Sequence, residues 1–183
     1  MIALFLEGVV ASVDHRLLVR EAVANLTAEL RDNEKELEAL FANLDKERQQ
    51  LEHADEIAGL MLAHTPLKHI ELALDIHRAE LKNAAVTTGQ ITGAFGYMEY
   101  GEVSRYANVY DLQAQFMRLQ EREEQHLMAV LAFVRRVAGP GAPADDGLQQ
   151  WRTQIELALA GIVDREQTGR VLQKRYQDLL ARR

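Results

Sequence analysis

The sequence predicts an all-α protein, and three observations lead to this fold class. Apolar residues recur every three or four positions over most of the 183 residues, which is the period of a helix with one buried face. Only three residues are proline and 6% are aromatic, which is unusual for a β-sandwich. Apolar residues make up 48% and charged residues 27%, as in a folded chain. We expect long antiparallel helical hairpins that form a bundle or coiled coil of four to six helices.

Residues 1–13 are mostly apolar, and only Glu7 among them is charged. About 20 apolar residues are needed to cross a bilayer as a helix, so this stretch cannot cross one alone. It also lacks the basic start of a secretory signal peptide. Two interpretations remain: the beginning of a buried core helix, or the end of a membrane anchor whose first part precedes this chain.

A first long helix is predicted from about Leu17 to about Ala63. Its apolar positions alternate in steps of three and four, with interruptions at Asn33 and Glu47, which predicts self-association of the coiled-coil kind along residues 23–61. Asn33 would either set the register of that interface or occupy a tolerated, partly solvated position. The apolar members of this interaction seam include Val23, Leu26, Leu30, Leu37, Leu40, Leu44 and Leu51.

The sequence HTPLKH at 64–69 ends this helix, and Thr65 followed by Pro66 is typical of the start of a second one, which we expect to reach about Asn83. His64, His69 and His77 flank this turn. They would form a pH-sensitive or metal-binding corner, or they are ordinary surface histidines.

Residues 84–101 contain four glycines among apolar residues, which predicts a short helix followed by a corner at about Gly96. Aromatic residues concentrate in and after this stretch. They would pack together where helices meet, or line a ligand pocket with their phenol groups. This aromatic corner consists of Phe95, Tyr97, Tyr100, Tyr106 and Tyr110.

A further long helix is predicted from about Glu99 to about Val137. Within it, Glu123 and His126 are spaced i, i+3, as in di-iron carboxylate bundles. Such bundles need a second Glu-x-x-His pair, and the sequence has none, so these residues are either metal ligands or part of a solvated charged face.

The sequence AGPGAPADDG is rich in Gly, Pro and Asp and predicts a linker. We therefore divide the chain into the end of an anchor (1–13), a long-helix bundle (14–138), a linker (139–147) and a C-terminal helical segment (148–183). In the last segment, Asp164 and Gln167 resemble a capping box that would restart a final helix after Gly161.

Composition excludes several classes of function. The chain has no cysteine, so disulfides, thiolate metal sites and cysteine nucleophiles are excluded. The net charge of −7 argues against a general nucleic-acid binder. Ser12 and Ser104 lie in no nucleophile motif, and no phosphate-binding loop occurs.

Two stretches carry a resemblance: IALFLEGVVASVDHRLLVREAVANLTAELRDNEKELEAL and AAVTTGQITGAFGYMEYGEVSRYANVYDLQAQF. They are similar to a group of uncharacterised bacterial proteins in which an N-terminal membrane helix continues into a charged helix. The resemblance covers less than half of the chain and implies a topology, a single-pass anchor followed by a helical domain, and no activity.

These observations predict a non-enzymatic, membrane-associated helical interaction or scaffold protein without a cofactor. The expected location is the bacterial inner membrane, with the periplasmic side slightly favoured because few basic residues follow the anchor. We expect a homo-oligomer, an additional protein partner, and no nucleic acid. The alternatives are a metal-binding bundle that uses Glu123 and His126, and a bundle that binds a small ligand.

Overall fold

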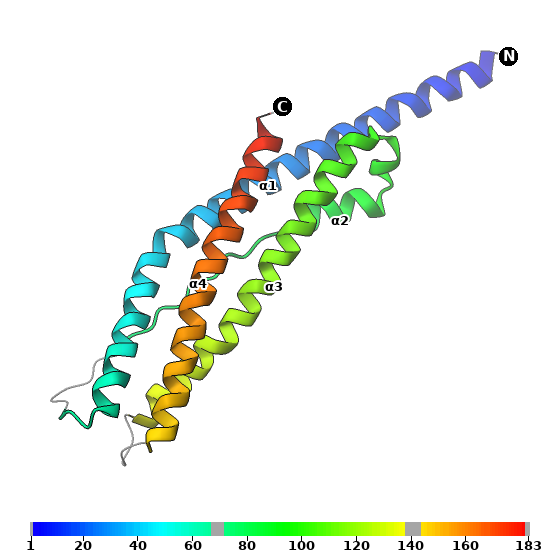
Figure 1. Ribbon diagram of the computed structural model, residues 1–183. Coiled ribbons are helices and arrows are strands. Elements are labelled where there is room, and N and C mark those ends of the chain that lie inside the picture. Colours follow the sequence, from blue (N-terminus) through cyan, green and yellow to red (C-terminus); the bar gives the residue numbers. More distant parts are fainter. Residues whose placement is uncertain (1, 67–71, 138–143, 182–183) are drawn as a thin grey trace. The chain divides into compact units, whose positions relative to one another are not determined.

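The computed structural model describes residues 2–66, 72–137 and 144–181, with side chains from Val13 to Pro66, from Leu72 to Val134 and from Ala144 to Ala181. Within these ranges the regular structure consists of α1 (Ile2–Leu62), α2 (Ala84–Ile91), the short 3-10 helix η1 (Ala94–Tyr97), α3 (Tyr100–Val137) and α4 (Asp145–Leu180) (Figure 1). The described residues form no strand. The all-α class is therefore confirmed.

Several predicted elements are confirmed. The short helix and corner appear as α2 and η1, the helix from Glu99 to Val137 appears as α3, and the helix from Leu17 is part of α1. The predicted restart at Asp164 is wrong, because α4 continues through it. Gly161 is helical and lets α4 pack closely on α3, since a Cβ there would lie 2.9 Å from the Cγ of Glu123.

The predicted second helix is wrong over residues 72–83, which we call the non-helical segment (Figure 1). Its sequence, LALDIHRAELKN, has helical periodicity, but an isolated helix of this length is marginal in water. Side chains of the long helices bind its main-chain groups, as described below. These bonds replace the helical ones, so tertiary context overrides local propensity.

The chain divides into two compact units, each built from discontinuous stretches. Unit 1 contains Met1–Leu37, Glu80–Ala114 and Leu172–Arg183, and unit 2 contains Glu38–Ala79 and Gln115–Val171. Each unit therefore includes parts of α1, α3 and α4 and part of the non-helical segment.

Unit 1 has its own apolar core, to which α1, α2, α3, α4 and η1 contribute. Its fully or nearly fully buried residues include Leu26, Leu30, Leu37, Ala85, Ala94, Tyr106, Val109, Tyr110, Leu172 and Tyr176. The corner after α2 depends on two glycines. Gly93 has a left-handed φ of 72°, and a Cβ on Gly89 would lie 2.6 Å from the Phe95 ring.

Unit 2 has a second core, to which α1, α3, α4 and the non-helical segment contribute buried residues, among them Trp151. Trp151 stacks on Phe133 with ring centroids 4.9 Å apart. The other core residues include Leu40, Leu44, Leu51, Ala54, Ala79, Phe116, Val130, Ile155, Ala158 and Ile162.

Among the described residues, no helix combines the length and the apolar character that crossing a bilayer requires.

Candidate functional site: two polar clamps on a non-helical segment

In unit 2, side chains of the long helices bind the main chain of the non-helical segment. The side-chain amide of Gln120 on α3 donates to the carbonyl of Ala79 (3.1 Å) and accepts from its N–H (3.0 Å). Gln50 on α1 accepts from the N–H of Asp75 (2.9 Å). Because these bonds go to main-chain atoms, they hold the backbone regardless of the side chains attached to it.

His77 is bound by charged groups. Its N–H donates to Glu47 on α1, and its carbonyl accepts from Nη1 of Arg165 on α4 (2.8 Å). Glu47 and Arg165 also pair directly with each other. Glu123 on α3 is the third charged member, with its Oε2 3.1 Å from Nε of Arg165. We call Glu47, Glu123 and Arg165 the charged clamp.

The charged clamp is buried and unequal in charge. Each of its three residues is less than 5% exposed. Two carboxylates face one guanidinium, and neither carboxylate oxygen of Glu123 has a hydrogen bond within the described residues. Burial raises the pKa of Glu123 to about 7, although the nearby Arg165 lowers it. Glu123 therefore changes its charge near neutral pH.

In unit 1, neutral amide side chains bind the main chain of the non-helical segment. Asn33 on α1 donates to the carbonyl of Lys82 (2.8 Å) and accepts from its N–H (2.8 Å). Gln113 on α3 donates to the same carbonyl (2.9 Å) and accepts from Asn33 (3.1 Å) and from the hydroxyl of Tyr176 (2.7 Å). We call Asn33 and Gln113 the amide clamp.

Next to the amide clamp, Glu29 binds the start of α2. Its carboxylate accepts from the N–H of Ala85 (2.9 Å) and from the hydroxyl of Tyr110 (2.6 Å). Burial and the bond to Glu29 raise the pKa of Tyr110, and burial raises that of Tyr176. Both phenols therefore stay protonated donors at neutral pH.

The signal for both clamps was present in the sequence. Asn33 and Glu47 are the two interruptions of the apolar seam, and they lie 14 residues apart, or two heptads. On α3, Gln113 and Gln120 are likewise seven residues apart at buried positions. A polar residue at a core position needs a buried partner, but periodicity alone does not identify that partner.

The apolar seam residues Leu26, Leu30, Leu37, Leu40, Leu44 and Leu51 are buried inside the chain itself, and Val23 is half-buried. Two copies of this fold could not share those six leucines without opening a core. Self-association through the seam stays a prediction, and it would require the buried leucines to leave the core.

The structure separates the two predicted metal-ligating residues. Glu123 belongs to the charged clamp, whereas Nδ1 of His126 lies 2.9 Å from the side-chain oxygen of Gln154. The described residues bring together no group of three or more His, Cys, Asp or Glu side chains suited to hold a metal ion.

The predicted histidine corner is only partly described. His77 lies 3.2 Å from Glu47 through Nδ1, and the exposed His64 lies 3.8 Å from Asp145. His69 falls outside the described residues.

The aromatic corner splits into a buried and an exposed half. Tyr106 and Tyr110 are buried in the core of unit 1 and Phe95 packs on Gly89, whereas Tyr97 and Tyr100 are exposed. The ring of Tyr97 stacks on His15 of α1, with centroids 3.7 Å apart.

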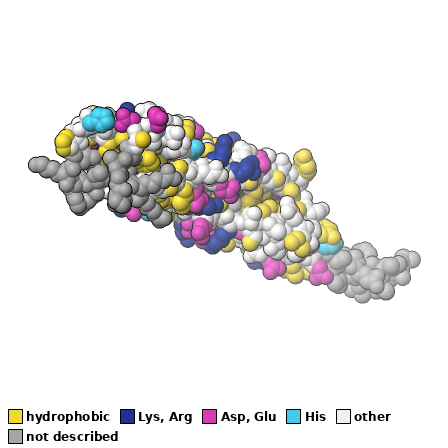
Figure 2. Space-filling model, turned by 90° about the horizontal axis from the view of Figure 1, so that it is seen from below, with side chains coloured by type: hydrophobic (Ala, Val, Ile, Leu, Met, Phe, Trp, Pro, Cys, Tyr) yellow, Lys and Arg dark blue, Asp and Glu magenta, His cyan; other side chains and the backbone are white. Residues whose placement is uncertain are grey.

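Three further large apolar residues of unit 1 are exposed, and two of them, Val13 and Leu17, flank His15, on which Tyr97 stacks. Ile91 is 81% exposed and Tyr100 is 87% exposed. We call this set the exposed apolar cluster: Val13, Leu17, Ile91, Tyr97 and Tyr100. On the face of the molecule in Figure 2, Lys and Arg side chains lie among Asp and Glu side chains, so charge of one sign does not dominate there.

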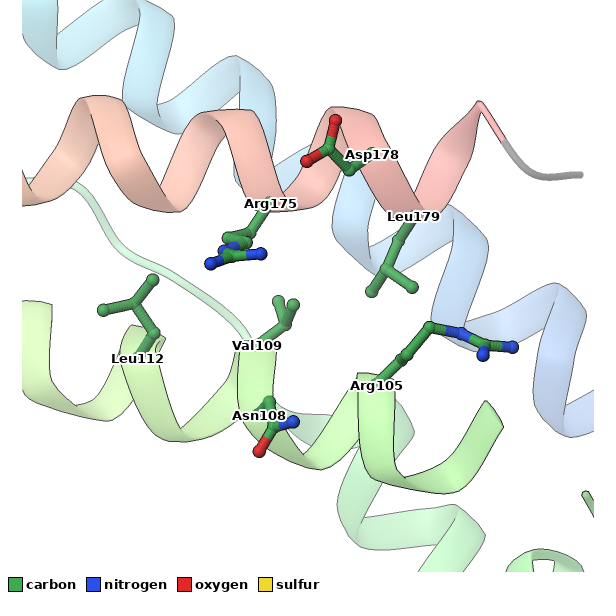
Figure 3. A pocket seen from close by; sticks show the side chains of 7 residues that line it. All are labelled: Arg105, Asn108, Val109, Leu112, Arg175, Asp178 and Leu179. Atoms are coloured by element: carbon green, nitrogen blue, oxygen red, sulfur yellow. The ribbon is translucent and has the colours of Figure 1, made fainter. Parts of the chain in front are cut away.

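Unit 1 also contains a groove between α3 and α4 with a volume of about 340 Å³. Val109, Leu112 and Leu179 provide apolar lining, and Arg105 and Arg175 provide positive charge. Figure 3 shows the guanidinium of Arg175 between the two helices, while Asp178 points away. Neither arginine pairs with an acidic residue in the described part of the chain.

Compared with protein-family models, curated proteins and solved structures, the chain matches none of them.

Proposed function

We propose that this protein is a non-enzymatic, membrane-associated helical interaction protein. The observation that carries this proposal is the exposed apolar cluster of unit 1. Exposed apolar and aromatic side chains that gather on one surface mark a contact with a membrane or with another protein, and the stacking of Tyr97 on His15, between Val13 and Leu17, supports such a surface. Tyrosine in particular is enriched at membrane–water interfaces, where its ring is apolar and its hydroxyl is solvated.

The covering surface that fits best is a bilayer. The cluster includes Val13 and Leu17 of α1, and the apolar run 1–13 leads directly into these residues. A run of this length suits an interfacial position. Arg16 and Arg20 are exposed on the same helix and suit anionic headgroups. The resemblance to bacterial single-pass proteins supports the same location, at the inner membrane and with the periplasmic side slightly favoured.

The interaction part of the proposal follows from how the bundle uses its buried polar groups. In both units they hold a stretch of main chain, so in each unit the long helices form a frame for an irregular segment. We propose that this frame, with antiparallel hairpins as its building units, displays exposed helix faces to a second copy or to another protein.

Vesicle flotation tests the membrane association. The full chain is expected to float with vesicles that contain anionic phospholipid, and an Ile91→Ser, Tyr100→Ser double variant is expected to float much less. The matched control is Leu157→Ser with Val171→Ser, which removes exposed apolar residues from unit 2. Equal flotation of both double variants would refute the role of the cluster, and absence of wild-type flotation would refute membrane association.

Crosslinking in cells tests the interaction. Recurrent crosslinks to one other protein would identify the partner, and crosslinks between copies of this chain would identify self-assembly. A protein that stays uncrosslinked at every exposed lysine would contradict an interaction role.

A second candidate, a ligand-binding bundle, is favoured by the groove between α3 and α4. Two arginines that form no ion pair with the acidic residues described, beside an apolar lining, suit an anion with an apolar body. Thermal stabilisation by decanoate, lost in Arg105→Gln with Arg175→Gln, would favour this candidate. Equal stabilisation by decanol would exclude recognition of the anionic group.

A further inference from the structure

Unit 2 contains a cavity of about 270 Å³ beside the charged clamp. Glu123, Gln120 and Arg165 contribute polar groups to its wall, and Ile76, Leu127 and Met128 contribute apolar ones. The cavity is smaller than most drug-sized sites, which begin at roughly 300 Å³, so it suits a ligand with few non-hydrogen atoms.

The polar wall has one negative charge too many when Glu123 is ionised. Arg165 is the only cation within the charged clamp, and its two Nη atoms are used by Glu47 and by the carbonyl of His77. Its Nε lies 3.1 Å from Glu123 but forms no hydrogen bond with it. A carboxylate that is 3% exposed is thus left without a hydrogen bond among the described residues, and so is Nε of Arg165.

The neighbouring donors other than Nε of Arg165 bind elsewhere. Both hydrogen-bonding groups of the Gln120 side chain bind Ala79. Arg78 also lines the cavity, but it pairs with Glu124 at 3.2 Å and with Glu121 at 3.9 Å. His77 directs Nδ1 toward Glu47, 3.2 Å away. A cation with hydrogen-bond donors would therefore balance the ionised form of Glu123.

We propose that this cavity binds a small primary ammonium ion with a short alkyl chain. The Glu123 side chain would turn its buried oxygens toward the cavity and accept hydrogen bonds from the ammonium group, whose charge balances the second carboxylate of the charged clamp. The alkyl chain would lie against Ile76, Leu127 and Met128. A divalent metal ion fits less well, because the described residues supply no third ligand of the required type.

The titration of Glu123 is consistent with such a ligand. Because burial raises the pKa of Glu123 to about 7, a proton competes with the ammonium ion for the same oxygens. Binding should therefore tighten as the pH rises from about 6 to about 8 and Glu123 loses its proton.

Thermal unfolding and calorimetric titration with n-butylammonium chloride test the proposal, with n-butanol and potassium chloride as controls. Stabilisation by the amine alone is expected, since a ligand specific for the folded state raises the melting temperature. In Glu123→Gln the affinity should fall by about tenfold or more. In the control Glu156→Gln, an exposed residue of α4 in the same unit, it should stay unchanged.

Three results would overturn the proposal. Equal stabilisation by potassium chloride would assign the effect to a monovalent metal ion or to ionic strength. Equal binding to Glu123→Gln would show that the amine binds at another site. If wild type binds no amine at millimolar concentration above pH 7, the cavity does not bind this ligand. Circular dichroism of Glu123→Gln verifies that the variant is folded, and Glu123→Asp, which keeps the charge, should retain part of the binding.

Discussion

In unit 1 the main chain of Lys82 is bound by the neutral amides of Asn33 and Gln113, whereas in unit 2 the main chain of His77 is bound by Glu47 and Arg165, which carry opposite charges. An amide side chain donates and accepts at once, so it satisfies a peptide group without any buried charge. A charged pair forms stronger bonds, but each charge must be balanced. The charged clamp contains one carboxylate too many, and this difference makes unit 2 the pH-sensitive half.

The largest effect is expected from Arg165→Met in the charged clamp. It leaves Glu47 and Glu123 buried without their cation and removes the donor to the His77 carbonyl, so the free energy of unfolding should fall by about 3–5 kcal/mol. Urea denaturation measures this loss. The control is Arg170→Met, an exposed residue that lies over the ring of Phe41, with an expected loss of about 1 kcal/mol or less. Similar losses in both variants would show that the charged clamp contributes little.

Asn33→Ala removes the corresponding residue of the amide clamp. The N–H and the carbonyl of Lys82 both lose a partner, and the free energy of unfolding should fall by about 2–3 kcal/mol. Asn43→Ala is the matched control, because Asn43 binds only the Ala39 carbonyl of its own helix, and about 0.5 kcal/mol or less is expected. If Asn33→Ala costs no more than Asn43→Ala, the amide clamp is not a stabilising feature.

The pH dependence of stability should belong to unit 2. The pKa of Glu123 is about 7 in the folded protein against an ordinary value of 4.5, so the folded state holds the proton more tightly. This contribution is complete below about pH 4.5 and is lost as the pH rises through about 7, by about 3 kcal/mol. Urea midpoints between about pH 5 and about pH 8 should fall in wild type.

The variant Glu123→Gln separates this contribution from others, because it should flatten the slope. Asp75 acts in a different window: Lys46, 2.6 Å away, lowers the pKa of Asp75 below 3.8, so its effect lies at more acidic pH. An unchanged slope in Glu123→Gln would assign the pH dependence to another group.

The smallest effect is expected from Gln50→Ala, at the exposed end of the unit 2 contacts. Gln50 binds the N–H of Asp75, where water can replace it, so about 0.5 kcal/mol or less should be lost. Chemical denaturation measures the free energy of unfolding of this variant and of Gln120→Ala. The bonds of Gln120 to Ala79 are buried, so Gln120→Ala should lose more. A larger loss for Gln50→Ala would mean that burial does not set the strength of these contacts.

The sequence predicted the long helices well because their apolar faces repeat over many turns, as along α3, where the predicted and observed bounds differ by one residue at the start. It failed for residues 72–83, because Leu72, Ile76 and Ala79 are spaced as in a helix although their main chain is bound by other elements. Local periodicity contains no information on those distant partners. Asn33 and Glu47 gave part of this information, because they are polar residues at positions where the seam requires apolar ones.

For the candidate sites, too, the sequence did not identify partners that are distant along the chain. Glu123 was selected from the sequence for its spacing to His126, yet its partner is Arg165, which is 42 positions away in the chain and cannot be found by spacing on one helix. The exposed apolar cluster joins residues near position 15 to residues near position 97, and only the fold brings His15 onto Tyr97.

Amide hydrogen exchange by NMR tests most directly whether both clamps hold the non-helical segment. The N–H groups of His77, Ala79 and Lys82 should exchange as slowly as amides in the cores of the helices. Asn33→Ala should selectively accelerate Lys82, and Gln120→Ala should selectively accelerate Ala79. Exchange of all three in wild type at the rate of an unstructured peptide would contradict the account.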